Sequence, residues 1–490
     1  MNICKYIFPA FLAAAALVPQ NVCAEWNDSI RWKAEMRVNA GGGDNSPFWI
    51  MSDQYGMSSR KPNNGYLRFG AFHDMDESKR FSWGAGADIA VGYGMQSVFF
   101  PQQLYGEVKY RCLDAMLGAK EITDGFLNTE LSSGGLTYSN NAHPIPQLRV
   151  GIFDYANVWG CKDLFAIKGY IAYGAMTDNW WIKRWANPKY DYTLNTLYCS
   201  RAIYFRIGNK EKFPLEGEIG LEMATEFGGT TYFPNGKKDK HPSDFKAWMK
   251  ALVPSKGSKE TAVGEQLNVE GNMLGNWAFS LRWEDPSGWM VRAYYEHFFE
   301  DHSMLFFDYT WKDGLYGIEA RLPKNPFVSN VLYEFLYMKD QSGPVYWDHT
   351  PSIDYQVSER DEYYNHYIYN GWQHWGMGIG NPLLMSPIYN RNHYMYFYST
   401  RVAAHNFGIM GQPTDQIGYK LRMSYISSLG TYSTPYLCEK HDFSMLAEVK
   451  YNPRRLHGWE GSLGFAFDKG SLMGDNYGAV LTISKTGFFK

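Results

Sequence analysis

Apolar and polar residues alternate with a period of two along most of this 490-residue chain. In the clearest run, residues 81–93, seven apolar or aromatic positions from Phe81 to Tyr93 alternate with Ser, Gly, Ala and Asp. Successive side chains of a pleated strand point to opposite faces, so this pattern predicts strands with one apolar face and one small or polar face. Similar runs occupy residues 30–38, 215–223, 277–284, 443–451 and 459–468.

Charged residues recur on the polar face of these strands. A β-sandwich would expose that face to solvent, whereas a transmembrane barrel would enclose it in a polar lumen and turn the apolar face to lipid. Strand pattern alone does not separate the two, but three features favour the barrel. The strands are about ten residues long, as a tilted crossing requires, and aromatic residues end many apolar faces. The last strand also ends on Phe488 and Phe489.

Short and long connections alternate between the expected strands. Short ones are expected at 74–80, 210–214, 285–288, 312–314 and 452–457, and long ones at 40–64, 122–146, 175–200, 227–275 and 428–441. Short periplasmic turns and long outer loops are typical of outer-membrane barrels. We count fourteen strands up to Lys339 and five or six after it. Because an even number is expected, this predicts an all-β, antiparallel transmembrane β-barrel of about 18 strands.

Eighteen strands use roughly 190 residues, which leaves more than half of the chain in loops. Long loops rich in aromatic residues are expected to be ordered and functional. We therefore expect inserted loops and a short helix to plug the lumen. Ser243 is the expected cap of that helix, with an apolar face packed on the barrel rim. That face comprises Phe245, Trp248, Met249 and Leu252.

The first 24 residues have the pattern of a secretory signal. Lys5 precedes an apolar run over residues 6–18, and Val22-Cys23-Ala24 precedes the expected cut. A lipoprotein signal would need a smaller residue than Val22 before Cys23. We thus expect residues 1–24 to be a signal peptide and residues 25–490 to be a single barrel domain in the outer membrane.

The composition argues against nucleic acid and zinc as partners. The 47 basic and 50 acidic residues give a net charge of −3, without the basic excess of a nucleic-acid binder. The 37 Tyr, 30 Phe and 17 Trp fit a strand-rich chain. Outside the signal lie Cys112, Cys161, Cys199 and Cys438. Their spacing matches no zinc pattern, and disulfides or isolated thiols are both open. We expect no metal and no cofactor.

Catalytic motifs are missing from the sequence: there is no H-E-x-x-H, G-x-S-x-G or P-loop. The glycine-rich run Gly376–Gly380 is expected to be a closely packed turn. The three glutamates at 216–222 could hide a glycosidase pair, but a charged lumen face with neighbouring Arg and Lys explains them better. The four histidines between 366 and 405 lack metal-ligand spacing, so ordinary hydrogen-bonding roles are expected. The chain is not expected to be an enzyme.

The segment from Asp361 to Tyr389 combines aromatic rings with short amides. Rings can cover the C–H face of a sugar while amides and carboxylates bind its hydroxyls, so the segment suits polyhydroxylated ligands. Packing of a plug against the barrel wall is the alternative for every residue there. Within this segment and the residues that follow it, the polysaccharide-binding candidates are Asp361, Tyr363, Tyr364, Asn365, Trp372, Gln373, Trp375, Asn381, Arg401 and His405.

Several short stretches resemble the Wzi family of outer-membrane capsule assembly proteins, in the family's order along nearly the whole mature chain. These stretches are Asn45–Trp49, Leu104–Lys109, Leu117–Glu121, Tyr363–Asn365, Gly371–Trp372, Gly378–Leu384, Arg401–His405 with Phe407–Ile409, Tyr419–Leu421 and Leu429–Tyr432. One departure is that no segment here predicts the periplasmic helical bundle of enterobacterial members.

The resemblance implies a barrel of about eighteen strands with a blocked lumen. It implies a surface lectin that holds capsular polysaccharide or exopolysaccharide on the outer membrane, without catalysis. The other expected partners are outer-membrane lipid and the barrel assembly machinery. Two alternatives remain: an open porin for sugars or small solutes, and a secreted β-rich carbohydrate enzyme.

Overall fold

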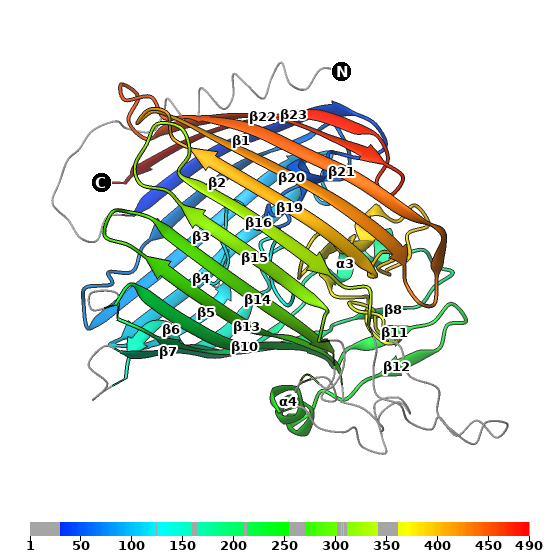
Figure 1. The fold of residues 1–490 in the computed structure, drawn as a ribbon. Helices are drawn as coiled ribbons and strands as arrows, with labels where there is room; N and C mark the ends of the chain where they lie inside the picture. The colour runs from blue at the N-terminus through cyan, green and yellow to red at the C-terminus, as the bar shows by residue number, and fades with distance from the viewer. Residues whose placement is uncertain are drawn as a thin grey trace.

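Eighteen strands form one closed antiparallel barrel (Figure 1). The structure, a computed structural model, describes residues 30–489 except 124, 159–163, 210–212, 254–270, 301–304, 306, 308–310 and 342–360. The wall strands are β1 (Arg31–Gly42), β2 (Asn64–His73), β3 (Phe81–Tyr93), β4 (Phe99–Tyr110), β5 (Leu113–Ala119), β6 (Gln147–Asn157), β7 (Phe165–Ala175), β9 (Leu197–Ile207), β10 (Leu215–Phe227), β13 (Asn272–Glu284), β14 (Met290–Glu300), β15 (Gly314–Arg321), β16 (Asn330–Tyr337), β19 (Val402–Gly411), β20 (Ile417–Gly430), β21 (Pro435–Tyr451), β22 (Trp459–Gly470) and β23 (Asn476–Phe488).

The first and last strands close the barrel. β1 pairs with β2 on one side and with β23 on the other, in a ladder from Arg31 opposite Phe488 to Gly42 opposite Tyr477. Closure leaves no edge strand in the wall. In hydrocarbon, where water cannot satisfy backbone groups, this is the condition for a sheet to span.

The alternation predicted from the sequence is confirmed, with the apolar face outside. Phe81 and Leu104 are 60% and 65% exposed, whereas Asp88 and Glu334, on the inner face, are 2% and 1% exposed. A soluble sandwich would bury the apolar set, so the sandwich is excluded. An apolar outer belt around a polar interior is the architecture of an outer-membrane barrel, and this protein is one. Its outer belt contacts lipid.

The two ends of the barrel differ. Connections of at most eight residues join the strands at the end that holds both termini, here called the turn end. The opposite loop end carries the connections 43–63, 120–146, 176–196, 228–271 and 338–401 (Figure 1). In outer-membrane barrels short turns face the periplasm and long loops face outward.

Three details of the expected connections are wrong, although the total of 18 strands is right. Thirteen wall strands, not fourteen, precede Lys339. Within the expected long connections, β8 (Tyr192–Leu194), β11 (Thr230–Tyr232) and β12 (Lys238–Lys240) form a separate sheet. Residues 312–314 lie at the loop end rather than in a short turn. Residues 428–441 are largely strand, because β20 and β21 extend into a hairpin.

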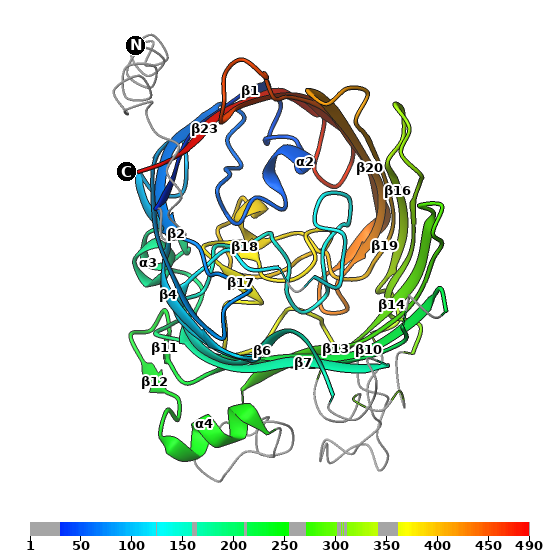
Figure 2. The ribbon, with the colours of Figure 1, turned by 90° about the vertical axis from the view of Figure 1, so that its left-hand side faces the viewer.

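The expected helix forms as α4 (Phe245–Leu252), outside the wall against β9 and β10 (Figure 2). Its cap is Asp244 rather than Ser243: the Asp244 carboxylate accepts from the Ala247 amide at 2.9 Å. Trp248 packs against Tyr173, with ring centroids 4.7 Å apart, as expected of a rim contact. Phe245, in contrast, is 80% exposed. None of the described helices is long and apolar enough to cross a bilayer.

Loop-end segments 43–63, 120–146 and 361–401 turn back inside the ring of strands (Figure 2). The first contains the buried helix α2 (Phe48–Met51), whose Phe48 amide donates to Asp468 of the wall at 3.0 Å. The second is bound by Glu334 of β16, which accepts from Ser132 Oγ at 2.6 Å and from the Ser133 amide at 2.7 Å. Inward carboxylates of the wall thus satisfy the backbone of the inserted segments.

Cysteines form no disulfide among the described residues. Cys112 and Cys438 are exposed thiols and Cys199 is buried, so no pairing among these three occurs. Cys161 and the expected signal peptide at residues 1–24 lie outside the described part of the chain.

Replacing Glu334 tests whether wall carboxylates hold the inserted segments. Glu334→Leu removes the acceptor of two bonds from residues 132–133 and leaves buried donors unpaired, at a cost of about 1–3 kcal/mol. We expect faster proteolysis within residues 120–146, while the barrel keeps its heat-modifiable gel mobility. Glu77→Leu at the turn end should leave both unchanged. Equal protease resistance of wild type and Glu334→Leu would contradict this anchoring role.

Candidate functional site

Most of the candidate residues proposed from the sequence are buried inside the barrel. Tyr363, Tyr364, Trp372, Gln373, Trp375 and Asn381 are each at most 8% exposed. Their polar atoms bind neighbouring segments: Trp372 Nε1 donates to the Thr137 carbonyl at 2.9 Å, and Asn381 Nδ2 donates to Ser133 Oγ at 3.2 Å. Trp372 and Asn381 thereby join the 361–401 segment to the 120–146 segment, whereas Gln373 donates to Asp178 of the 176–196 connection.

Three candidates lie half-buried at the border of this packed region. Asn365 binds the backbone of Phe397 in both directions, at 2.8 and 3.0 Å. The Arg401 guanidinium lies 3.8 Å from the ring centroid of Tyr432, on the β20–β21 hairpin. The amide of Asp361 donates to the carbonyl of Gln341 at 3.0 Å.

His405 is separated from the other nine candidates. It is an exposed residue of β19 on the outer wall, where its Nδ1 lies 2.7 Å from the Tyr333 hydroxyl. His405 faces outward because it stands between the inward-facing Ala404 and Asn406 of β19, and successive residues of a strand point to opposite faces.

The interpretations of His374 and of the glycine-rich run agree with the contacts. His374 hydrogen-bonds the carbonyl of His143 and the hydroxyl of Thr177, at 2.9 and 3.0 Å. Gly376 has a φ of 82°, and a Cβ there would lie 2.5 Å from Trp181, so it is a closely packed turn. Among the described residues, no group of His, Cys, Asp and Glu has the arrangement of a metal site.

The suspected glutamate set of β10 belongs to a charged lumen face. Glu216 lies 3.6 Å from Arg206 and 3.8 Å from Arg282, both on neighbouring strands. Glu218 accepts from Ser280 Oγ at 3.3 Å. The lumen explanation given to these carboxylates therefore fits their contacts.

A row of tyrosines at the loop end was missed from the sequence. Tyr394, Tyr396 and Tyr398 alternate with the buried Met395 and Phe397, so their half-buried rings lie away from the buried side of this stretch. The rings of Tyr394 and Tyr396 are nearly parallel, at 7°, with centroids 5.4 Å apart. The period-two pattern was visible in residues 394–398, but it fell between expected strands.

Tyr190, from the 176–196 connection, stacks on Tyr394 with centroids 4.3 Å apart. We call Tyr190, Tyr394, Tyr396 and Tyr398 the tyrosine row. Beside it, His393 stacks on Trp185 at 4.8 Å, so two loop connections contribute rings to one surface.

Polar groups line the edge of the tyrosine row. Asn392 Nδ2 donates to the Tyr398 hydroxyl at 2.8 Å, and the Tyr396 hydroxyl lies 2.7 Å from Ser433 Oγ. Glu362 hydrogen-bonds both the Tyr396 hydroxyl and the Ser433 amide. Burial and the Glu362 carboxylate raise the pKa of Tyr396 to about 12, so its hydroxyl remains a donor at neutral pH. Ring faces next to short polar groups are the chemistry that binds sugars.

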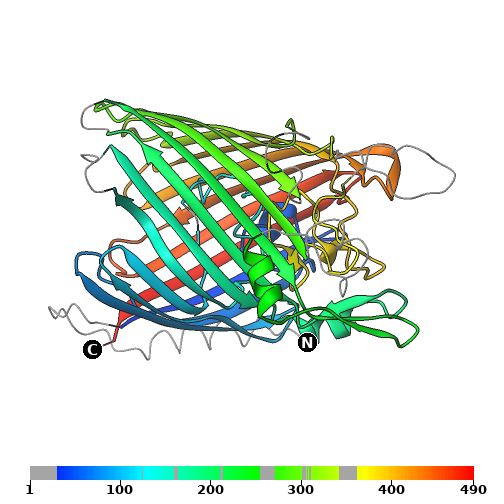
Figure 3. The same ribbon diagram turned by 90° about the horizontal axis from the view of Figure 1, so that it is seen from below.

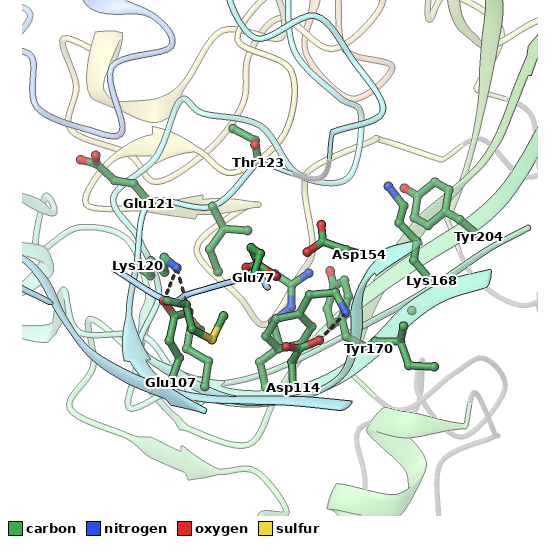
Figure 4. A pocket seen from close by; sticks show the side chains of 17 residues that line it. Glu77, Glu107, Asp114, Lys120, Glu121, Thr123, Asp154, Lys168, Tyr170 and Tyr204 are labelled. Atoms are coloured by element: carbon green, nitrogen blue, oxygen red, sulfur yellow. Dashed lines mark hydrogen bonds and ion pairs between the residues drawn. The ribbon is translucent and has the colours of Figure 1, made fainter. Parts of the chain in front are cut away.

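Two polar cavities lie in the lumen between the inserted segments and the turn end. The smaller has a volume of about 290 Å³ (Figure 4). On its wall Lys120 pairs with Glu107 at 2.7 Å, and the Asp114 carboxylate accepts from the Phe153 amide at 3.0 Å. The larger, of about 430 Å³, is bordered by Lys33, Glu35, Glu130, Lys420 and Lys450, among others.

No protein-family model and no curated protein sequence matches this chain. Among solved structures, the chain is similar to Escherichia coli Wzi, described as a carbohydrate-binding β-barrel involved in group 1 capsule assembly. The TM-score is 0.55 at 10% identity, over 94% of this chain and 84% of Wzi.

Two further solved structures match over nearly the whole chain. Acinetobacter baumannii OccAB2 has a TM-score of 0.48 at 8% identity, over 95% of this chain and 98% of OccAB2. A BenF-like porin from Pseudomonas fluorescens Pf-5 has a TM-score of 0.48 at 9% identity, over 94% and 98%. At such identities the likeness to Wzi establishes the fold alone: an outer-membrane β-barrel.

A buried carboxyl makes the anchoring of the 361–401 segment depend on pH. Asp313 accepts from the Gln341 amide at 2.7 Å and from the Tyr363 hydroxyl at 2.9 Å. Burial raises the pKa of Asp313 to about 7. Protonated Asp313 therefore stabilises the fold fully below pH 3.8, the ordinary pKa of its carboxyl. This stabilisation is lost as the pH rises through 7.

We expect the amides of residues 361–364 to exchange more slowly at pH 5 than at pH 8, after correction for intrinsic exchange rates. Hydrogen–deuterium exchange with mass spectrometry measures this. Asp313→Asn should flatten the difference, whereas Asp285→Asn at the turn end should leave it intact. A wild-type protein with equal corrected protection at both pH values would contradict the role of Asp313.

Proposed function

We propose that this protein is an outer-membrane binding protein that holds polysaccharide at the cell surface. The observation that carries the proposal is the tyrosine row at the loop end. Its rings are mounted on a segment whose other face is buried in the barrel. A platform held in place before binding loses little conformational entropy when a ligand docks.

The chemistry of the row suits a chain of sugars. The row offers apolar ring surface to the C–H side of a pyranose, while Asn392, Glu362 and Ser433 offer hydrogen bonds to hydroxyls at the edge. A polymer with repeating units can occupy several such positions at once. Modest contacts with each sugar then combine into durable retention.

Two observations support capsular polysaccharide or exopolysaccharide as the ligand. The ordered stretches from Asn45–Trp49 to Leu429–Tyr432 resemble the Wzi family, and the fold is similar to that of Wzi, itself described as carbohydrate-binding. We further propose that residues 1–24 direct export and that the barrel assembly machinery inserts the chain.

The original candidates take two roles in this proposal. Trp372, Trp375, Tyr363, Tyr364, Gln373 and Asn381 hold the platform from beneath. Direct contact falls to the tyrosine row, with Asp361, Asn365 and Arg401 near its border. His405, on the lipid-facing wall, is not proposed as a ligand contact.

A porin for sugars or small solutes is the second candidate function. The polar lumen cavities of about 430 and 290 Å³ favour it. The inserted segments 43–63, 120–146 and 361–401 oppose it, and we propose that they plug the lumen between these cavities and the loop end.

Alanine substitutions in the row test the binding function. Tyr394→Ala and Tyr396→Ala should each weaken binding of the purified barrel to the cell's own surface polysaccharide by roughly three- to tenfold. A lost aromatic contact is worth about 0.5–1.5 kcal/mol. In cells the same variants should shift polysaccharide from the cell-bound to the released fraction.

Tyr333→Ala, which removes an exposed tyrosine from the lipid-facing wall, is the matched control and should retain polysaccharide normally. Heat-modifiable mobility verifies that each barrel has assembled. Undiminished binding in the Tyr394→Ala and Tyr396→Ala double variant would refute the row as the binding surface.

Conductance separates the binding protein from the porin. Purified protein in planar bilayers is expected to give no large steady current, because the inserted segments occupy the lumen. Deleting residues 125–141 should open the barrel and produce such currents. Large steady currents from the wild-type protein would favour the porin.

A further inference from the structure

An arginine faces outward from the apolar wall in the half of β9 nearest the loop end. Arg201 shares the outer face of this strand with the exposed Ile203, and it stands opposite Ile171 of β7 and Met223 of β10. Its guanidinium donates to Thr225 Oγ1 at 3.2 Å and lies 3.8 Å from the sulfur of Met273. It also contacts the Cys199 side chain, and no carboxylate among the described residues pairs with it. A cation on the lipid face is costly without an anionic partner.

Arg201 lines one part of an apolar groove in the outer wall, with a volume of about 480 Å³. Gly169 occupies an outward position opposite Ile203, so the wall has no side chain there. The rim comprises Val150, Ile167, Ile171, Ile203, Leu221 and Met223, with Leu252 of α4 beside it. A groove of this composition accepts hydrocarbon.

Helix α4 lies on the outside of the barrel against the wall (Figure 3), and its Leu252 borders this groove. It is held by Trp248, whose carbonyl accepts from the Tyr173 hydroxyl at 2.7 Å. Phe245, Met249 and Val253 are exposed apolar residues at the helix. An apolar strip on a helix that carries lysines suits the interface between acyl chains and headgroups.

We propose that the groove and Arg201 bind one phosphorylated glycolipid of the outer leaflet, of the lipid A type. One acyl chain fills the groove, and a phosphate pairs with the guanidinium, whose planar fork suits phosphate oxygens. The placement of Arg201 on the loop-end half of β9 selects the outer leaflet, because the loop end faces outward. The site lies outside the barrel and is separate from the tyrosine row.

Native mass spectrometry of the full-length folded protein tests this site. The protein is purified in detergent and titrated with bis-phosphorylated lipid A, dephosphorylated lipid A or phosphatidylglycerol. We expect one bis-phosphorylated lipid A to be retained, with at least tenfold weaker retention of the other two. Arg201→Gln should lower the retention of bis-phosphorylated lipid A at least tenfold.

Ile203→Trp, which fills the groove and leaves the charge in place, should lower retention as well. Arg206→Gln, on the opposite face of the same strand, is the matched control and should bind like the wild type. Equal retention by Arg201→Gln and wild type would overturn the proposal. The proposal would also be overturned if the wild type retained dephosphorylated lipid A or phosphatidylglycerol as well as it retains bis-phosphorylated lipid A.

Discussion

A backbone that crosses hydrocarbon must satisfy its own hydrogen bonds, and the rest of this molecule depends on that constraint. The wall meets it only by closing, through the ladder between β1 and β23. Once the sheet is closed, each strand has one face toward lipid and one toward the lumen. The alternation of apolar and polar residues then has a single consistent arrangement, because a one-residue slip would place charges such as Asp88 in lipid.

The same closure creates an interior that must be filled or hydrated. Here, part of the charge on the inner face is neutralised by other wall residues, as in the group formed by Glu216, Arg206 and Arg282. Another part binds the inserted segments: Glu334 and Asp468 accept backbone amides from residues 133 and 48. The loop-end surface is therefore supported by the barrel itself. The ordered tyrosine row is a consequence of this support.

The residues first singled out in the 361–389 segment illustrate how far pattern reasoning extends. Its aromatic and amide content predicts contact with a polyhydroxylated ligand, with packing inside the barrel as the alternative. Trp372 and Asn381 meet their polar partners in the 120–146 segment rather than in a ligand. An aromatic residue that packs against a loop is of the same type as one that binds a sugar, so the sequence does not distinguish the two roles. The row at 394–398 shows the same difficulty, because its exposure depends on which face packs inward.

From the sequence alone follow the strand periodicity, the count of about eighteen, the lipid-exposed apolar face and the lack of a catalytic motif. Each of these features can be read from single segments or by counting segments along the chain. Side-chain alternation, for example, is set by backbone geometry within each strand. Only the tertiary structure decided the position of α4 outside the wall, the separation of His405 from its sequence neighbours and the place of the tyrosine row at the loop end. It also brought Arg201 to the apolar groove. Each of these depends on contacts between segments far apart in the chain, whose packing no local pattern encodes.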